Sequence, residues 1–303
     1  GFGTVERAAQ ELRTWREQGH SGAPSSPARI FAGTLERAVK SGEVMHPARA
    51  NPGASPIDSG STCWLWIESA VRPGTHVTGR IFHYDINQAF WSATRKGLPS
   101  QFFPYQDGDQ EWVGRVKIQS ADRRLPAHWR YQDTATVTAD DVRFWGMDVE
   151  IIDAVSYAEY EVDISGVMQE IGQHYTDWTA KRARQQGWGV FAQSPGSIFQ
   201  EVYRGGEMTS QTALPERWVC PEWAAIITRR IMRQVASRQR EGEAVCMYVD
   251  SVLSRRPISG QGSSVGTWRK EGEYDQGVYI EGPGLWDTRP RATRYPSTKW
   301  KKH

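Results

Sequence analysis

The sequence predicts an α+β fold, because helical and strand patterns both recur along its 303 residues. After a proline, apolar Trp223, Ile227, Ile231 and Val235 repeat every four residues, which is typical of a helix that begins at the proline. The stretch THVTGRIFHYDI, residues 75–86, alternates β-branched or apolar residues with polar ones, which is typical of a strand. A chain of this length has room for one large core or two smaller ones.

The other elements follow from the same patterns in chain order. Gly/Ser/Pro-rich stretches predict two connectors near the N-terminus, and TADD predicts a helix start within residues 134–146. The strand over residues 75–86 is expected to end near Asp85, which places that carboxylate at a strand-to-helix junction. We expect helices over residues 5–19, 29–42 and 164–186 and from near Gln88, and strands over residues 111–119, 134–138 and 149–162.

The composition predicts a globular protein, because 38% hydrophobic and 24% charged residues with 14 Trp do not fit a disordered chain. No stretch approaches the roughly 18 apolar residues of a membrane span, so no membrane partner is expected. Cys63, Cys220 and Cys246 favour neither a disulfide framework nor a zinc site, so we expect a reducing, cytoplasmic setting. The start at Gly1 suggests a trimmed tag or an excised fragment.

Basic residues gather in the C-terminal part of the chain, although the net charge is only +2. The clusters are KRAR at 181–184, TRRIMRQVASRQR at 228–240, SRR at 254–256 and the C-terminal KWKKH. Such clusters could lie along a phosphate backbone. For any single cluster, a solvated helix face is the alternative.

Three chemically different side chains are expected on one face at the end of the helix predicted over 164–186. Lys181, Gln185 and Trp188 follow one another at helical spacing. A lysine, an amide and an indole make a poor core and a good ligand surface, so a binding role is predicted. The alternatives are a solvated helix end for the lysine and a core aromatic for the indole.

Asp85 and Asp250 each interrupt an apolar pattern that we interpret as a strand. A buried ionised carboxylate requires a cation, hydrogen-bond donors or a route to solvent. If the two strands lie side by side, the acids can share divalent metal. A pair of aspartates that holds two Mg²⁺ ions, with substrate phosphates completing the shell, is the usual arrangement for nucleotidyl transfer. A structural aspartate is the alternative in each case.

Several segments, in the right order, resemble the motifs of family-B DNA polymerases. YDINQAFWSA resembles the D-x-x-S-L-Y-P motif, and KRARQQGWGVFAQSP resembles K-x-x-x-N-S-x-Y-G in the form found in protein-primed polymerases of phages and linear plasmids. AAIITRRIMRQV resembles the helix before the third motif, YVDSV resembles that motif, and VGTWRKEGEY resembles the G-x-W-x-x-E strand. The resemblance covers about residues 60–286.

The resemblance implies a polymerase palm, an antiparallel sheet with helices on one face, with helical fingers and a short or absent thumb. No 3′–5′ exonuclease is expected, because residues 1–80 offer no D-x-E with further acids and leave too little room for that domain. The expected parts are an N-terminal helical segment and linker over 1–60, palm over 61–163, fingers over 164–200, and palm with a short thumb-like tail over 201–303.

The resemblance also implies roles for individual residues. Asp85, Asp250 and the backbone carbonyl of Ile86 would hold two Mg²⁺ ions, for which Mn²⁺ can substitute. Phe90 would lie under the incoming sugar and exclude a 2′-hydroxyl. Lys181 would contact the triphosphate, Gln185 and Trp188 would line the nascent base pair, and Gly189 would allow close approach of the template.

The sequence departs from the family motifs at several positions. Gln88 and Trp91 replace a serine and a proline, and Gln185 with Gln186 replaces an Asn-Ser pair. Tyr248 stands where the third motif has its first acid. These departures weaken the expected acidic shell and alter the reach of the hydrogen-bonding groups.

Two interpretations of function remain from the sequence, with a third resting on the aromatic residues alone. The first is a magnesium-dependent, compact DNA polymerase of a phage or mobile element, without proofreading. Its partners would be template-primer DNA, dNTPs and a priming protein, in the host cytoplasm or a virion. The second is a degenerate polymerase fold that serves as a nucleic-acid-binding or structural part of a replication or virion assembly. The third is an unrelated Trp-rich carbohydrate-binding or hydrolytic domain.

Overall fold

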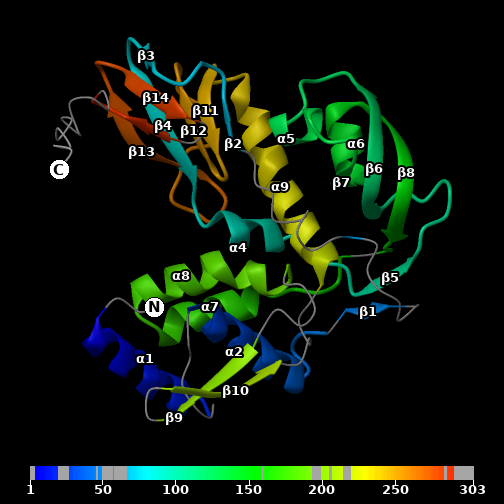
Figure 1. Cartoon of the computed structure of the whole chain (residues 1–303), viewed down its shortest axis with the longest axis vertical. Helices are drawn as coiled ribbons and strands as arrows, with labels where there is room; N and C mark the ends of the chain where they lie inside the picture. The colour runs from blue at the N-terminus through cyan, green and yellow to red at the C-terminus, as the bar shows by residue number, and fades with distance from the viewer. Residues whose placement is uncertain are drawn as a thin grey trace, which may run out of the picture. The chain divides into compact units, whose positions relative to one another are not determined.

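The computed structural model describes residues 4–19, 27–45, 47–49, 57, 67–158, 160–192, 199–204, 207–213, 220–282 and 285–289. Helices and mostly antiparallel sheets make up these residues, which confirms the predicted α+β class (Figure 1). Cys220 and Cys246 are buried, whereas Cys63 and the basic segment 299–303 lie outside the described residues.

Two compact units make up the chain, and both are discontinuous in sequence. The first unit comprises Gly1–Trp64, Phe90–Arg124 and Gln132–Arg229. The second comprises Leu65–Ala89, Leu125–Tyr131 and Arg230–His303. The sequence-based part boundaries stay a prediction.

Helices around a shared core form one part of the first unit. Phe31 is fully buried and meets Phe191 edge-to-face at 5.9 Å, and Phe191 meets Trp223 at 5.2 Å. A Cβ at Gly187 would lie 2.3 Å from the Phe31 ring, so glycine permits this close approach. The helices here are α1 (Val5–Glu17), α2 (Pro27–Lys40), α7 (Ser165–His174), α8 (Asp177–Gly187), the 3₁₀-helix η1 (Trp188–Val190) and the first half of α9 (Pro221–Gln239).

A five-stranded sheet in the order β1-β5-β8-β6-β7 forms another part of the first unit. Its strands are β1 (Ala48–Arg49), β5 (Gln101–Pro104), β6 (Trp112–Ala121), β7 (Ala135–Thr138) and β8 (Met147–Ser156), and β1 pairs with β5 in parallel. Helix α6 (Ala139–Trp145) begins, as TADD predicts, at a capping box of Thr138 and Asp141. A separate hairpin joins β9 (Phe199–Arg204) to β10 (Glu207–Ala213).

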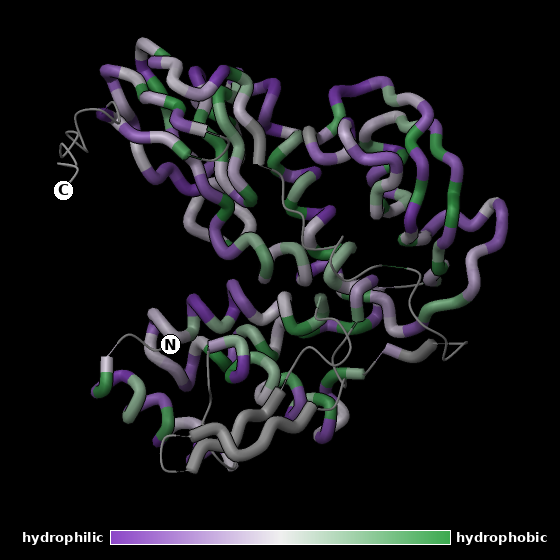
Figure 2. The backbone as a smooth tube through the Cα atoms, in the orientation of Figure 1, coloured by the Kyte–Doolittle hydropathy of each residue, from purple (hydrophilic) through white to green (hydrophobic). Residues whose placement is uncertain are grey.

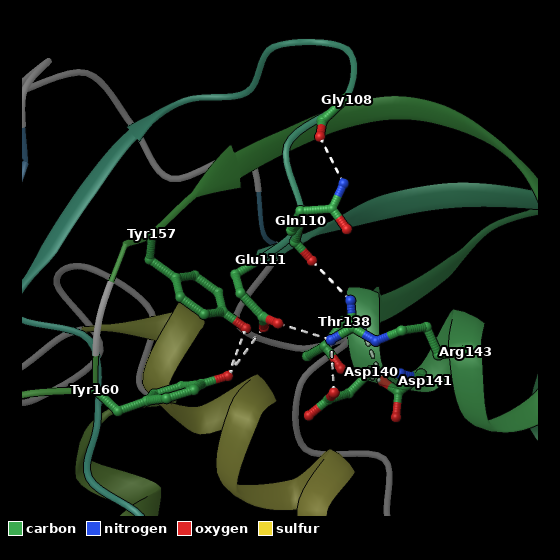
Figure 3. A network of polar contacts seen from close by, with 9 residues as sticks. All are labelled: Gly108, Gln110, Glu111, Thr138, Asp140, Asp141, Arg143, Tyr157 and Tyr160. Carbon is green, nitrogen blue, oxygen red and sulfur yellow. Dashed lines mark hydrogen bonds and ion pairs between the residues drawn. The ribbon is translucent and has the colours of Figure 1, made fainter.

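A polar network fastens α6 to the two residues that precede β6 (Figure 3). Arg143 donates to the Gln110 carbonyl at 2.8 Å, to Glu111 at 2.8 Å and to Asp140 at 2.7 Å. The Tyr160 hydroxyl donates to the same glutamate at 3.3 Å. These contacts stabilise the sheet and its helix, and the network has no link to the predicted site residues among the bonds described.

A five-stranded antiparallel sheet, β13-β4-β12-β11-β2, is the centre of the second unit. A three-stranded sheet, β15-β14-β3, packs with it around a core that includes Ile81, Val245, Leu253, Val278 and Ile280. The strands are β2 (Ile67–Ser69), β3 (Thr75–Val77), β4 (Ile81–Ile86), β11 (Ala244–Tyr248), β12 (Ser251–Ser254), β13 (Trp268–Tyr274), β14 (Val278–Gly282) and β15 (Leu285–Asp287), with the short helix α5 (Ala127–Arg130) in the same unit.

The single helix predicted over residues 164–186 is wrong, because the chain breaks between α7 and α8. Tyr175 is extended at φ −111° and ψ 156°. Its hydroxyl donates to Gln18 Oε1 at 2.8 Å, and the Thr176 hydroxyl donates to Glu11 Oε1 at 2.6 Å. Glu11 is fully buried in α1, so contacts with a distant helix override the local helical pattern.

No helix within the described ranges is long and apolar enough to cross a membrane. Hydrophilic and hydrophobic residues are mixed along the helices (Figure 2).

The basic cluster at 228–240 is not wholly a surface feature, because Arg229 is 1% exposed.

Candidate functional site

Strand pairing in the second unit brings the backbones of the two predicted acids together. β4 and β12 run antiparallel, with Asp85 opposite Ser251, the residue after Asp250. The Ile86 N–H donates to the Asp250 carbonyl at 2.9 Å. The backbone ladder therefore places Asp85, Ile86 and Asp250 at one end of the sheet, independently of their side chains.

Asp250 lies in a turn and not in a strand, which corrects the interpretation of the apolar pattern around it as one strand. Val249 and Asp250 form the two-residue connection between Tyr248 and Ser251, which pair across β11 and β12. Val249 has φ +56°, a conformation that is costly for a β-branched residue. Positive φ at the first turn residue is the conformation that tight hairpins require.

A second strained residue follows the other acid. Gln88 has φ +53° where the chain leaves β4, and α4 (Ala89–Thr94) begins at the next residue, one position from the predicted start. Asn87 holds this junction through its side-chain amide, which donates to the Ser263 carbonyl at 2.5 Å and to the Ser264 carbonyl at 3.1 Å. Positive-φ backbone thus lies next to Asp250 and three positions after Asp85, and such backbone is common at functional sites.

The two carboxylates are half-buried in a charged setting. The Asp85 side chain is 30% exposed, and Arg269 Nη2 lies 3.9 Å from its Oδ2. Arg269 also forms an ion pair with Glu271. Asp250 is half-buried at the turn. The sequence motifs did not single out this arginine, which becomes visible only when β13 is placed beside β4.

The two carboxylates and the backbone carbonyl fit a divalent ion whose remaining coordination positions are filled by a substrate. No group of three or more His, Cys, Asp or Glu side chains with metal-binding geometry occurs among the residues that the structure describes. Mg²⁺ typically takes only one or two carboxylates and fills the remaining positions with water and phosphate oxygens. Tyr248, where a further acid would be expected, has 48% of its surface exposed.

Two predicted residues of the first unit form an aromatic stack. Phe90 in α4 and Trp188 in η1 have ring centroids 5.0 Å apart and planes inclined by only 5°. Phe90 is 8% exposed, so the indole covers one face of its ring. Stacking of this kind adds about 0.5–1.5 kcal/mol to the burial of the rings.

A cation–π pair that the motifs did not predict involves the residue after Phe90. The Arg184 guanidinium lies 4.8 Å from the centre of the Trp91 ring, and its Nε donates to the Met168 carbonyl at 2.8 Å. Burial lowers the pKa of Arg184. The cation–π contact packs Arg184 of α8 against Trp91 of α4.

The remaining predicted residues lie on or beside α8. Lys181 is exposed and Gln185 is half-buried. Trp188 keeps helical backbone angles, φ −60° and ψ −28°, so the predicted spacing continues past the end of the helix. A Cβ at Gly189 would meet nothing within 4 Å. These residues belong to the first unit with Phe90, whereas Asp85, Ile86 and Asp250 belong to the second.

Solved structures of Phi29 DNA polymerase share this fold. The binary complex with primer-template DNA has a TM-score of 0.61 at 12% identity, over 92% of this chain and 57% of that chain. The ternary complex with incoming nucleotide substrates has a TM-score of 0.58 at 12% identity, over 91% and 57%. The chain thus spans 57% of the length of these polymerases. No protein-family model and no curated protein matches the sequence.

Proposed function

We propose that the chain is a DNA polymerase that transfers nucleotides from dNTPs to a primer by two-metal catalysis. The observation that carries the proposal is the β4–β12 register, which sets Asp85 and Asp250 beside each other in a polymerase-like fold. The altered motifs leave this pair intact. Template-primer DNA is the proposed macromolecular partner, supported by the likeness to polymerase complexes with such DNA.

Asp85, Asp250 and the Ile86 carbonyl would hold Mg²⁺, or Mn²⁺ in its place, which would supply charge neutralisation for a reacting phosphate. In the reaction, the primer 3′-oxygen forms a bond with the α-phosphorus of the dNTP. The bond from that phosphorus to the β-phosphate oxygen breaks, pyrophosphate leaves, and the hydroxyl proton passes to solvent. Removal of the carboxylates would leave this charge uncompensated.

The residues of the first unit are proposed to bind the nucleotide. Lys181 would contact the triphosphate as a point charge. Gln185 and Trp188 would line the base pair, with Gly189 giving room for the template. Phe90, held by its stack, would exclude a 2′-hydroxyl, so Phe90→Ala is expected to increase ribonucleotide incorporation relative to deoxynucleotide incorporation. Protein priming and the lack of proofreading remain predictions.

Primer extension with Mg²⁺ or Mn²⁺ tests the proposal. Asp85→Asn and Asp250→Asn should each lower the rate at least about 10³-fold while the melting temperature changes little. Asp275→Asn is the matched control, because this exposed carboxylate of the same unit pairs with Arg80 and should leave the rate unchanged. A wild type that binds primer-template DNA but incorporates nothing would indicate a degenerate polymerase fold instead.

A further inference from the structure

One strand of the second unit places an arginine beside a proposed metal ligand. In the β13–β4 pairing Arg269 stands directly opposite Asp85, so the two side chains leave the sheet on the same face. Arg269 Nη2 is 3.9 Å from Asp85 Oδ2, and the Arg269 side chain is 48% exposed. The contact is long for an ion pair, so the guanidinium is not tightly committed to Asp85.

The same guanidinium has a closer partner on its own strand. The Arg269 Nε and Nη2 atoms both contact Glu271 Oε1. The β13 register shifts between Lys270 and Gly272, which makes Glu271 the extra residue of a bulge. Bulges redirect side chains, and here the bulged glutamate lies against Arg269. Arg269 is therefore shared between two acids, of which Asp85 is the more distant.

This sharing affects how a divalent ion would bind. Without a cation, the Asp85 carboxylate is partly compensated by the guanidinium. An arriving divalent ion repels that guanidinium and competes with it for the same carboxylate. Glu271 can retain the guanidinium when the contact with Asp85 is lost, so no charge is left without a partner.

We propose that Arg269 is a built-in counter-ion of Asp85 that a divalent ion displaces, with Glu271 as the acceptor of the displaced guanidinium. Arg269 is thus a positioning residue that weakens metal binding in the absence of substrate. The inference rests on the proposed function, since it requires a divalent ion at Asp85. It gives a role at Asp85 to Arg269 and Glu271, to which the motif resemblance assigns none, although both lie in the segment VGTWRKEGEY.

Calorimetric titration with Mn²⁺ alone, without DNA or nucleotide, tests the inference on the full chain. Arg269→Gln should tighten Mn²⁺ binding about threefold to tenfold, because it removes the competing charge. Arg269→Lys keeps the charge and should stay within about twofold of the wild type. Glu271→Gln should weaken binding about threefold, because it releases the guanidinium toward Asp85.

Lys270→Gln is the matched control. It removes the same charge from the next residue, whose ammonium group instead contacts Glu273 and lies 5.4 Å from the Phe82 ring centre. Its Mn²⁺ affinity should stay within about twofold of the wild type. Glu271→Gln should have little further effect in the Arg269→Gln background, because its action passes through the arginine.

The outcomes separate this inference from the proposed function. If wild-type Mn²⁺ binding is absent, the counter-ion role is overturned, and primer extension decides the proposed function separately. If binding persists in Asp85→Asn, the metal site and the proposed function are overturned. If binding depends on Asp85 but is unchanged or weaker in Arg269→Gln, only the counter-ion role is overturned. An equal gain in Lys270→Gln would also overturn it, since the effect would then be one of overall charge.

Discussion

The acids of the second unit and the aromatic residues of the first are held in place by different kinds of contact. Asp85 and Asp250 are positioned by a backbone ladder that does not depend on their side chains. Phe90 and Trp188 are positioned by ring packing between a six-residue helix and a three-residue 3₁₀-helix. Substitution at the acids should therefore remove chemistry without unfolding, whereas substitution at the rings should do both.

The largest expected difference between the regions is in stability. Phe90→Ala should lower the free energy of unfolding by about 3–5 kcal/mol, because it leaves a cavity and removes the stack with Trp188. Chemical denaturation of this variant beside Asp85→Asn measures the contrast. Equal stability of the two variants would show that the aromatic stack does not hold the first unit together.

Placing an acid beside the turn that holds Asp250 should have the next largest effect. Tyr248→Asp adds a carboxylate two residues from Asp250, and its exposed ring leaves no cavity. We expect about tenfold tighter Mn²⁺ binding by calorimetry, a gain of about 1.4 kcal/mol. Tyr248→Asn is the control, because asparagine has about the size of aspartate but no charge. An equal gain in that variant would contradict the electrostatic explanation.

A substitution in the strained turn should have a smaller effect, and it should increase the free energy of unfolding. Val249→Gly should raise the free energy of unfolding by about 0.5–1 kcal/mol, because glycine adopts φ +56° without steric cost and this outweighs its greater freedom when unfolded. Denaturation curves of the variant and the wild type measure the gain. A loss of stability would mean that packing of the half-buried valine outweighs its backbone strain.

The smallest effect concerns pH. Burial lowers the pKa of His83, with Glu271 partly opposing the shift. In the unfolded state His83 therefore takes up a proton near pH about 6.5, whereas in the folded state it takes up the proton only at lower pH. The contribution of neutral His83 to the free energy of unfolding is thus present above that pH and is lost as the pH falls. His83→Gln should flatten the change in urea-denaturation free energy between about pH 7.5 and about pH 5.5. An unchanged slope would contradict a half-buried imidazole that stays neutral in the folded state.

Local patterns predicted much of the fold. β4 is the strand that ends beside Asp85, but the single strand expected over residues 75–86 is wrong, because Gly79 has φ +88° and separates β3 from β4, which belong to different sheets. The helix after the proline is α9, with its apolar repeat buried. The capping box at Thr138 also lies where TADD predicts it. Each of these depends on residues a few positions apart, which is the range that periodicity and capping describe.

The features that were missed depend on contacts between distant segments. The break before α8 follows from Glu11 and Gln18, more than 150 positions earlier in the chain. The Arg269 contact with Asp85 requires knowledge of which strand pairs with β4. The turn at Asp250 was hidden because Val249 is a strand-forming residue in a conformation that it rarely adopts. The motifs located the acids, and only the register showed that their backbones meet.

β13 is the outermost strand of its sheet and exposes Arg269, Lys270, Glu271 and Glu273. An outermost strand offers unpaired backbone groups to any other chain, and a row of charges with a bulge discourages such strand addition. The residues that balance the charge of Asp85 therefore also oppose aggregation through this edge. A variant designed to tighten metal binding by removing these charges would expose the sheet to self-association, so its solubility should be followed together with its affinity.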